Sequence, residues 1–161
     1  MNPLLIRPNL NRQQLDDVLT QRGMAHTFSL ARYRLQRYVS RYINRYVDGD
    51  CLDAGCGRSP YRSMLAAKAT EVVSLDVEDR GGGADLIGDI QNLTQIQEAS
   101  FDTVFCSQVL EHVPRPWEAF SEFARVLRPG GRLILTVPHL SVIHEAPHDY
   151  FRNTQYGMGY L

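Results

Sequence analysis

The strongest constraint on the fold is an alternation between short apolar runs and helical patterns across the middle of the chain. Most of these runs contain β-branched or aromatic side chains, and turn residues lie beside them, which predicts strands. The five predicted strands cover residues 51–54, 71–76, 84–87, 101–106 and 132–137. Strands that alternate with helices pair in parallel through right-handed crossovers. We therefore expect an α/β fold with a mostly parallel sheet flanked by helices.

Helical spacing marks the stretches that precede or separate these strands. Apolar side chains recur every three or four positions over residues 27–46, 61–68 and 117–127. Ser59 is expected to cap the second of these helices, with Pro60 in its first turn. Pro129–Gly131 is expected to end the third helix before the last predicted strand begins.

The N-terminal part of the chain has helical patterns but no strand pattern. A weak pattern predicts a short helix between Asn11 and Gly23. The helix over residues 27–46 is expected to have one apolar face, made of Phe28, Ala31, Leu35, Val39, Tyr42 and Tyr46. It also carries a run of arginines without an intervening acid: Arg32, Arg34, Arg37, Arg41 and Arg45. This run is either a solvated helix face or a contact surface for an acidic substrate or a membrane surface. We expect residues 1–49 to form a helical extension and residues 50–161 to form the core domain.

Length and composition limit the classes of protein that fit. A chain of 161 residues is long enough for one domain with a sizeable core, and its formal net charge of -1 argues against nucleic acid as the main partner. No apolar run approaches the roughly 20 residues needed to span a bilayer, and the N-terminus lacks the apolar core of a signal peptide. Cys51, Cys56 and Cys106 are odd in number and lack CxxC spacing. We therefore expect a cytoplasmic protein without a disulfide framework or a zinc site.

The segment Leu52–Gly57 carries the clearest chemical signal. It follows the first predicted strand, and ligands of open α/β sheets bind beyond the carboxyl ends of the strands. Gly55 and Gly57 let the backbone pass close to a ligand because glycine has no Cβ. A single pair of glycines is also found in ordinary turns, but here Asp53 precedes the pair and Asp76 closes the second strand. The combination predicts a ligand-binding loop.

The two acids narrow the class of ligand. A dinucleotide fingerprint G-x-G-x-x-G needs a third glycine where Pro60 stands, so an NAD-dependent oxidoreductase is disfavoured. Asp53, two residues before Gly55, suits a cationic amino group and disfavours a pyrophosphate. Asp76, 19 residues after Gly57, can accept hydrogen bonds from two ribose hydroxyls.

These segments, taken with others further along the chain, resemble class I S-adenosylmethionine (SAM)-dependent methyltransferases, in the group with small-molecule acceptors. The segments that carry the resemblance, in order, are Leu52–Gly57, Ser74–Asp76, Gly88–Ile90, Phe101–Val104, Ser107–Val113 and Leu127–Leu133. The resemblance covers about residues 50–138. It implies a Rossmann-like, doubly wound sheet, SAM as the cofactor, and transfer of a methyl group to a small acceptor.

The resemblance also implies a role for each matching position. Asp53, Ala54, Gly55, Cys56 and Gly57 would surround the methionine part of SAM. At the next two strand ends, Asp76 would bind the ribose hydroxyls with Val77 beside the adenine, and Asp89 would bind the adenine amino group with Ile90 against the ring. Ser107 and Gln108 would lie near the methionine amino group, at the mouth of the site.

Histidines in two places, at position 112 and in the segment after the last predicted strand, allow two further interpretations. Glu111 and His112 form a possible acid–base pair, although methyl transfer to a good nucleophile depends mainly on positioning. His139, His144, Glu145, His148 and Asp149 crowd the segment after the last predicted strand, but their spacing matches no standard metal motif, so we predict no metal site. This segment is expected to cover the acceptor, with His144 or His148 as a base, or else to be a polar surface loop. No catalytic residue is assigned.

The resembling fold usually has seven strands, the last two forming an antiparallel pair at one edge. Only 24 residues follow Val137, and Phe151–Met158 looks like the approach to a further helix. We therefore expect an incomplete core whose fifth strand is an exposed edge, with a homodimer through that edge as one remedy. The leading hypothesis is a SAM-dependent methyltransferase, and the alternative is a SAM-binding fragment or scaffold that does not catalyse.

Overall fold

The computed structural model describes residues 30–161, with side chains described from Tyr33 onward. The helix expected near residues 11–23 lies outside this range, as do the side chains of Phe28, Ala31 and Arg32. Helix α2 spans Leu30–Tyr46. The chain divides into two compact units inside this helix, between Arg41 and Tyr42. The second unit, residues 42–161, holds the sheet and the loops that bear on function.

The described residues form a five-stranded sheet in the order β3-β2-β1-β4-β5, with every strand parallel to its neighbours. The strands are β1 (Asp50–Ala54), β2 (Glu71–Asp76), β3 (Leu86–Ile87), β4 (Phe101–Ser107) and β5 (Leu127–Thr136). The connecting helices are α3 (Arg62–Ala66), the 3-10 turn η1 (Leu110–His112) and α4 (Pro116–Val126), and α5 (Gln155–Met158) follows β5. The predicted α/β class with a Rossmann-like parallel sheet is confirmed.

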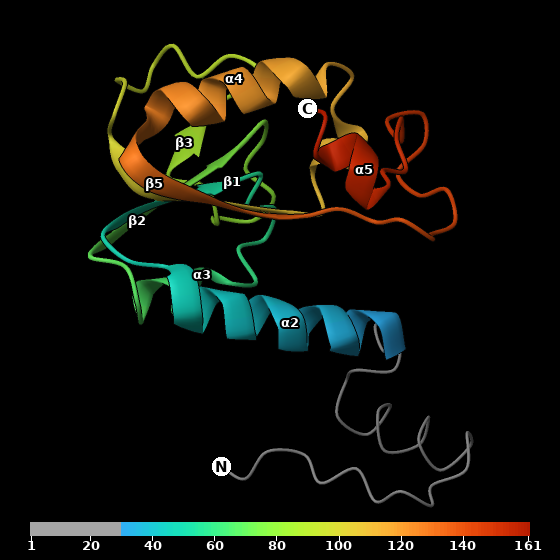
Figure 1. Cartoon of the computed structure of the whole chain (residues 1–161), viewed down its shortest axis with the longest axis horizontal. Coiled ribbons are helices and arrows are strands. Elements are labelled where there is room, and N and C mark those ends of the chain that lie inside the picture. The colour runs from blue at the N-terminus through green and yellow to red at the C-terminus, as the bar shows by residue number, and fades with distance from the viewer. Residues whose placement is uncertain (1–29) are drawn as a thin grey trace, which may run out of the picture. The chain divides into compact units, whose positions relative to one another are not determined.

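Helices on both faces bury the sheet. Figure 1 shows α4 along one face and α3 on the opposite one. The central strands supply fully buried side chains such as Leu52, Leu75 and Val104, and α4 adds Phe123, which is 1% exposed. Burial of a large apolar side chain contributes about 1.5–3 kcal/mol, so these positions hold the layers together.

Two local predictions, the cap of α3 and one position of the apolar face of α2, differ from the structure. Ser59 does not cap α3: its φ is 50° and its hydroxyl donates to the carbonyl of Gly83 over 2.8 Å. Within α2, Val39 is buried as predicted, but Tyr42 is half exposed and its neighbour Ile43 is buried instead. The arginines of α2 with described side chains, at positions 34, 37, 41 and 45, are exposed.

The start of β5 also differs from expectation, since Pro129–Gly131 lies within the strand. Leu127 pairs with Phe101 and Arg132 with Thr103, so β5 runs through five residue steps while β4 runs through two. The extra residues form an irregularity in which Gly130 has a φ of 85°. A bulge of this kind keeps both ends of the strand paired, so α4 ends at Val126 and pairing resumes immediately.

Charged hydrogen bonds join three strands at their N-terminal ends. Arg128 donates to Asp50 Oδ2 at 2.9 Å and also pairs with the Asp102 carboxylate. Asp102 in turn accepts from the backbone N–H of Asp50 at 2.8 Å. The first residues of β1, β4 and β5 are therefore held by one set of charged hydrogen bonds.

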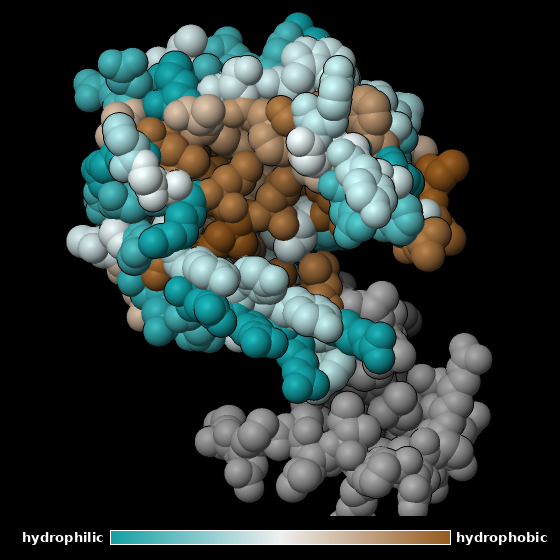
Figure 2. Space-filling model, in the orientation of Figure 1, coloured by the Kyte–Doolittle hydropathy of each residue, from teal (hydrophilic) through white to brown (hydrophobic). Residues whose placement is uncertain are grey.

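The outer edge of β5 has no strand beside it within residues 42–161. Figure 2 shows apolar side chains gathered below α4, where β5 crosses the front of the molecule in Figure 1. Leu133, Leu135 and Val137 of this region, with Phe120 of α4, pack against the core but are only partly buried. The predicted exposed apolar edge is thus present in the described chain.

Membrane-spanning helices and disulfides are both predicted from the sequence to be absent. None of the helices from α2 to α5 has the length and apolar character to cross a bilayer. Cys51, Cys56 and Cys106 are all buried free thiols. Burial raises the pKa of Cys51 to about 12 and also raises that of Cys106, so these thiols stay protonated and act as small core side chains.

Candidate functional site

The loop after β1 turns sharply at two glycines that differ in surroundings. The backbone N–H groups of Gly55 and Cys56 both donate to the Leu75 carbonyl, at 2.8 and 3.0 Å. Gly55 has a φ of 77°, and a Cβ there would lie 2.5 Å from a methyl group of Val109. Gly57 has a φ of 57°, but a Cβ there would meet no described atom within 4 Å. Gly55 therefore allows close packing, whereas Gly57 borders open space.

Asp53 is a buried acid in β1, 3% exposed, next to this loop. Burial raises its pKa to about 7, a nearby Arg62 opposes the rise and Asp76 adds to it. Its Oδ2 atom has no hydrogen-bond partner among the described residues. A buried carboxylate oxygen without a donor is costly to ionise. The position therefore fits a ligand that brings a cationic or hydrogen-bond-donating group.

Asp76 closes β2 beside the same loop. Its Oδ2 accepts from the Gly57 N–H at 2.7 Å, and its Oδ1 accepts a long hydrogen bond of 3.5 Å from the Glu78 N–H. A carboxylate has about four lone-pair directions, so Asp76 keeps acceptor capacity for a pair of hydroxyls. Val77, the next residue, exposes 58% of its surface and offers an apolar patch beside that carboxylate.

The segment after β3 carries Asp89 and Ile90. Asp89 is exposed and accepts from the backbone N–H of Gln91 at 2.9 Å and from its side-chain amide at 3.0 and 2.8 Å. Ile90 is 4% exposed and belongs to the core cluster, so little of its side chain remains to contact an adenine ring. Arg125 of α4 holds the following turn by donating to the carbonyl of Leu93 at 2.7 Å.

The end of β4 bears the remaining predicted residues. The Ser107 hydroxyl lies 2.8 Å from that of Thr136. Gln108 has a φ of 58°, an uncommon value for a residue other than glycine, and its N–H donates to the Thr136 carbonyl at 2.9 Å. Such backbone strain persists only where neighbouring contacts enforce it, and it concentrates at functional sites. Ala54 and Cys56, in contrast, are buried.

Sequence reasoning missed one charged pair beside this site. Arg62 donates to Asp85 at 2.7 and 3.1 Å and to the Ser74 hydroxyl at 2.8 Å. Asp85 also accepts from the Ser74 N–H at 2.8 Å, and these contacts hold the pKa of Asp85 below its usual range. No spacing rule connects residues from two separate crossovers, so the pair could be found only from the fold.

The late histidines do not gather as one group. His139 lies near the Asn153 carbonyl, His148 near the Tyr150 hydroxyl, and Glu145 pairs with Arg80. Of the residues weighed for a metal site, His144 and Asp149 approach each other, at 3.6 Å. His144 instead meets Glu111 and His112, which sequence reasoning had treated separately.

Residues 52–135 match the profile of a known family, described as a methyltransferase domain. The chain belongs to this methyltransferase domain family. The match begins within β1 and ends within β5, so it contains the whole of β2, β3 and β4 and all the proposed cofactor residues. The predicted resemblance to class I SAM-dependent methyltransferases is confirmed, and SAM is the cofactor that this family uses.

Curated relatives of this methyltransferase domain have specific names. The chain is 32% identical over 98 residues to a ubiquinone biosynthesis O-methyltransferase of Xanthomonas euvesicatoria pv. vesicatoria, covering 53% of the chain and 41% of the relative. A protein of the same name from Idiomarina loihiensis is 27% identical over 118 residues, covering 63% and 49%. The chain therefore spans about half the length of the curated relatives it matches.

Solved structures share the fold of this methyltransferase domain. A SAM-dependent methyltransferase from Archaeoglobus fulgidus superposes with a TM-score of 0.63 at 20% identity, over 81% of this chain and 65% of its own. One from Mesorhizobium loti gives a TM-score of 0.54 at 24% identity, over 65% of this chain and 54% of its own. At these identities the likeness concerns the fold alone.

Proposed function

We propose that this chain is the cofactor-binding part of an enzyme that transfers a methyl group from SAM to a small-molecule acceptor. The observation that carries the proposal is Asp53. Its carboxylate is buried, one oxygen lacks a partner among the described residues, and it stands beside the glycine loop at the ligand-binding edge of the sheet. The positively charged amino group of SAM would supply the missing partner.

The other strand ends suit the rest of the cofactor. Asp76 would receive the ribose hydroxyls while Gly57 keeps the space beside it open. The exposed Val77 would contact the adenine, and Asp89 would accept a hydrogen bond from the adenine amino group in place of its present contact with Gln91. Ile90 would limit the ring pocket from the core side.

The proposed reaction needs little general acid–base catalysis. SAM supplies an electrophilic methyl carbon on a positively charged sulfur; when the acceptor attacks, the carbon–sulfur bond breaks and its electron pair stays on sulfur. The protein's part is to align the acceptor with that bond and to exclude water. Ser107 and Gln108, fixed by Thr136, lie at the end of β4 where this alignment would be set.

The names of the relatives favour an oxygen nucleophile, such as a phenolic hydroxyl, as the acceptor group. We also propose that the functional unit is cytoplasmic and that residues 50–161 form the core, with residues 1–49 as its helical extension. The acceptor would enter beside the segment after β5, which lies against η1.

A second candidate is a module that binds SAM without turnover. The observation in its favour is the apolar edge of β5, which has no neighbouring strand in the described chain. Two copies joined through this edge would cover it, since exposed edge strands are templates for pairing. Light scattering coupled to size exclusion, with the Leu133→Lys variant as a comparison, tests whether such a dimer exists.

Calorimetry with SAM, S-adenosylhomocysteine and NAD separates the candidates. We expect the first two ligands to bind and NAD not to bind, with Asp53→Ala abolishing the binding. Transfer of a labelled methyl group to any member of a panel of phenols would establish the enzyme. Binding without transfer would favour the module, and no SAM binding at millimolar concentration would refute both.

A further inference from the structure

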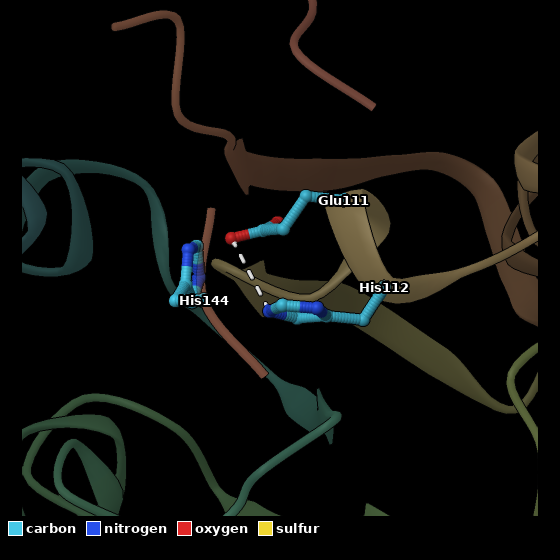
Figure 3. A group of neighbouring side chains, drawn as sticks. All are labelled: Glu111, His112 and His144. Atoms are coloured by element: carbon cyan, nitrogen blue, oxygen red, sulfur yellow. Dashed lines mark ion pairs between the residues drawn. The ribbon is translucent and has the colours of Figure 1, made fainter. Parts of the chain in front are cut away.

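A cluster of three ligand-type side chains lies where η1 meets the segment after β5. Glu111, His112 and His144 each present one donor atom, and these atoms all lie within 4.8 Å of one another. Figure 3 shows the three side chains converging, with His112 Nε2 at 3.9 Å from Glu111 Oε1. The rings of His112 and His144 meet edge to face with centroids 4.9 Å apart.

Glu111 makes this cluster unusual. Its side chain is fully buried, and both carboxylate oxygens lack a hydrogen-bond partner among residues 30–161. Buried carboxylates are normally hydrogen-bonded, paired or bound to a metal. The long approach of His112 provides none of these in full.

The two imidazoles are oriented for metal binding. The Nδ1 atom of His112 lies 2.6 Å from the carbonyl oxygen of His148, and that of His144 lies 3.1 Å from the carbonyl oxygen of Val142. A carbonyl only accepts, so Nδ1 of His112 carries the proton and its Nε2 keeps a lone pair. At His144 the Val142 carbonyl is nearer to Nδ1 than the Arg152 guanidinium nitrogen is, 3.1 against 3.4 Å, and this favours the same tautomer. This is the arrangement found around metal-binding histidines, where the second nitrogen donates to a backbone carbonyl or a carboxylate.

Backbone contacts set the position of the late segment independently of the cluster. The N–H of Tyr150 donates to the Glu111 carbonyl at 2.8 Å, and the N–H of His144 donates to Asp149 Oδ2 at 2.8 Å. Asp149 also pairs with the guanidinium of Arg152, which lies 3.4 Å from His144 Nδ1. The cluster is therefore held by the fold, and the nearby positive charge is already paired.

We propose that Glu111, His112 and His144 bind one divalent transition-metal ion, best matched by Zn²⁺. Two imidazoles and one carboxylate are a ligand set that Zn²⁺ accepts, with a fourth position left for water or another ligand. Ligand atoms around Zn²⁺ at about 2.1 Å stand about 3.4 Å apart, so the side chains need to close by up to about 1.4 Å. The ion would link the end of β4 to the segment after β5. This site does not depend on the proposed methyl transfer.

The test is calorimetric titration of the metal-free full chain with Zn²⁺, and with Mg²⁺ as a hard-ion comparison. We expect one Zn²⁺ per chain at micromolar concentration and no binding of Mg²⁺, which prefers oxygen ligands. His144→Gln should weaken Zn²⁺ binding at least about tenfold while leaving the fold intact, because its ring is partly exposed. Glu111→Gln should weaken it similarly, with circular dichroism as a check on folding.

His139→Gln is the matched control, because His139 lies in the same segment but outside the cluster. It should bind Zn²⁺ as the parent chain does. The proposal is overturned if the parent chain shows no binding up to about 100 µM Zn²⁺, if His144→Gln binds as tightly as the parent, or if His139→Gln loses as much affinity.

Discussion

Cofactor affinity should depend on pH through Asp53. Burial raises the pKa of this acid to about 7 in the free chain, whereas its ordinary value is near 3.8. A cationic amino group beside it would favour the ionised form, so binding would release a proton whenever the free carboxyl is protonated. We therefore expect affinity for S-adenosylhomocysteine to fall as the pH falls below 7.

The size of the effect follows from the pKa. If only the ionised carboxylate binds, about one tenth of the free chain is competent at pH 6 and about three quarters at pH 7.5. The dissociation constant at pH 6 should then be about eightfold larger than at pH 7.5. Calorimetry in two buffers of different ionisation enthalpy would also count the proton released on binding.

Asp53→Asn is the control, since an amide of nearly the same shape cannot titrate. Its affinity should be weaker and should vary little between pH 6 and 7.5. A parent chain with constant affinity over this range, or an Asn variant with the same pH dependence as the parent, would refute the assignment of Asp53 to the cofactor's amino group.

The same pKa has an opposite consequence for stability. The folded-state pKa of Asp53 is raised above its unfolded value, so the native chain holds a proton that the unfolded chain has lost between about pH 4 and pH 7. The free energy of unfolding should therefore decrease as the pH rises through that window, by up to about 4 kcal/mol, and then level off. Urea unfolding of the parent and the Asn variant measures the difference.

Two further substitutions test the packing around the site. Gly55→Ala should destabilise the chain by about 3 kcal/mol in urea unfolding, because a left-handed backbone is combined with a clash against Val109, whereas Gly57→Ala should cost about 1 kcal/mol and instead weaken cofactor binding. Equal losses of stability in the two variants would contradict this distinction. Arg125→Met should cost about 1 to 2 kcal/mol and speed hydrogen exchange at the Leu93 N–H, because Arg125 donates to the Leu93 carbonyl and holds Glu122, which accepts from that N–H. Unchanged exchange would mean that the turn is held by other contacts.

The positions of the glycine loop after β1 and of Asp76 at the end of β2 could be predicted because local rules govern them. A strand end, a left-handed turn and an acid at the next strand end each have a sequence pattern that spans only a few residues. The same rules failed at Pro129–Gly131, where three turn-forming residues suggested a break. There the pairing of β5 with β4 carries the strand through a bulge, and a tertiary contact of that kind has no local signature.

Contacts between side chains far apart in the sequence could not be predicted, for a related reason. His144 approaches Glu111 because the segment after β5 folds back onto η1, and the hydrogen bonds that fix this return join backbone groups that every residue carries. The burial of Ile43 in α2, where burial of Tyr42 was predicted, has a similar origin. Tyrosine and isoleucine are both apolar enough to be buried, so the pattern alone could not choose between them.

The charged ties of Arg128 to Asp50 and Asp102 stand at one end of the strands, and Asp53 and the glycine loop stand at the other. The first group is partly exposed, while Asp53 is shielded from water. Added salt screens exposed charges far more than buried ones. Added salt should therefore weaken the Arg128 ion pairs at the beginnings of the strands and leave Asp53 nearly unaffected. Salt concentration then changes the stability of the sheet separately from ligand binding at Asp53.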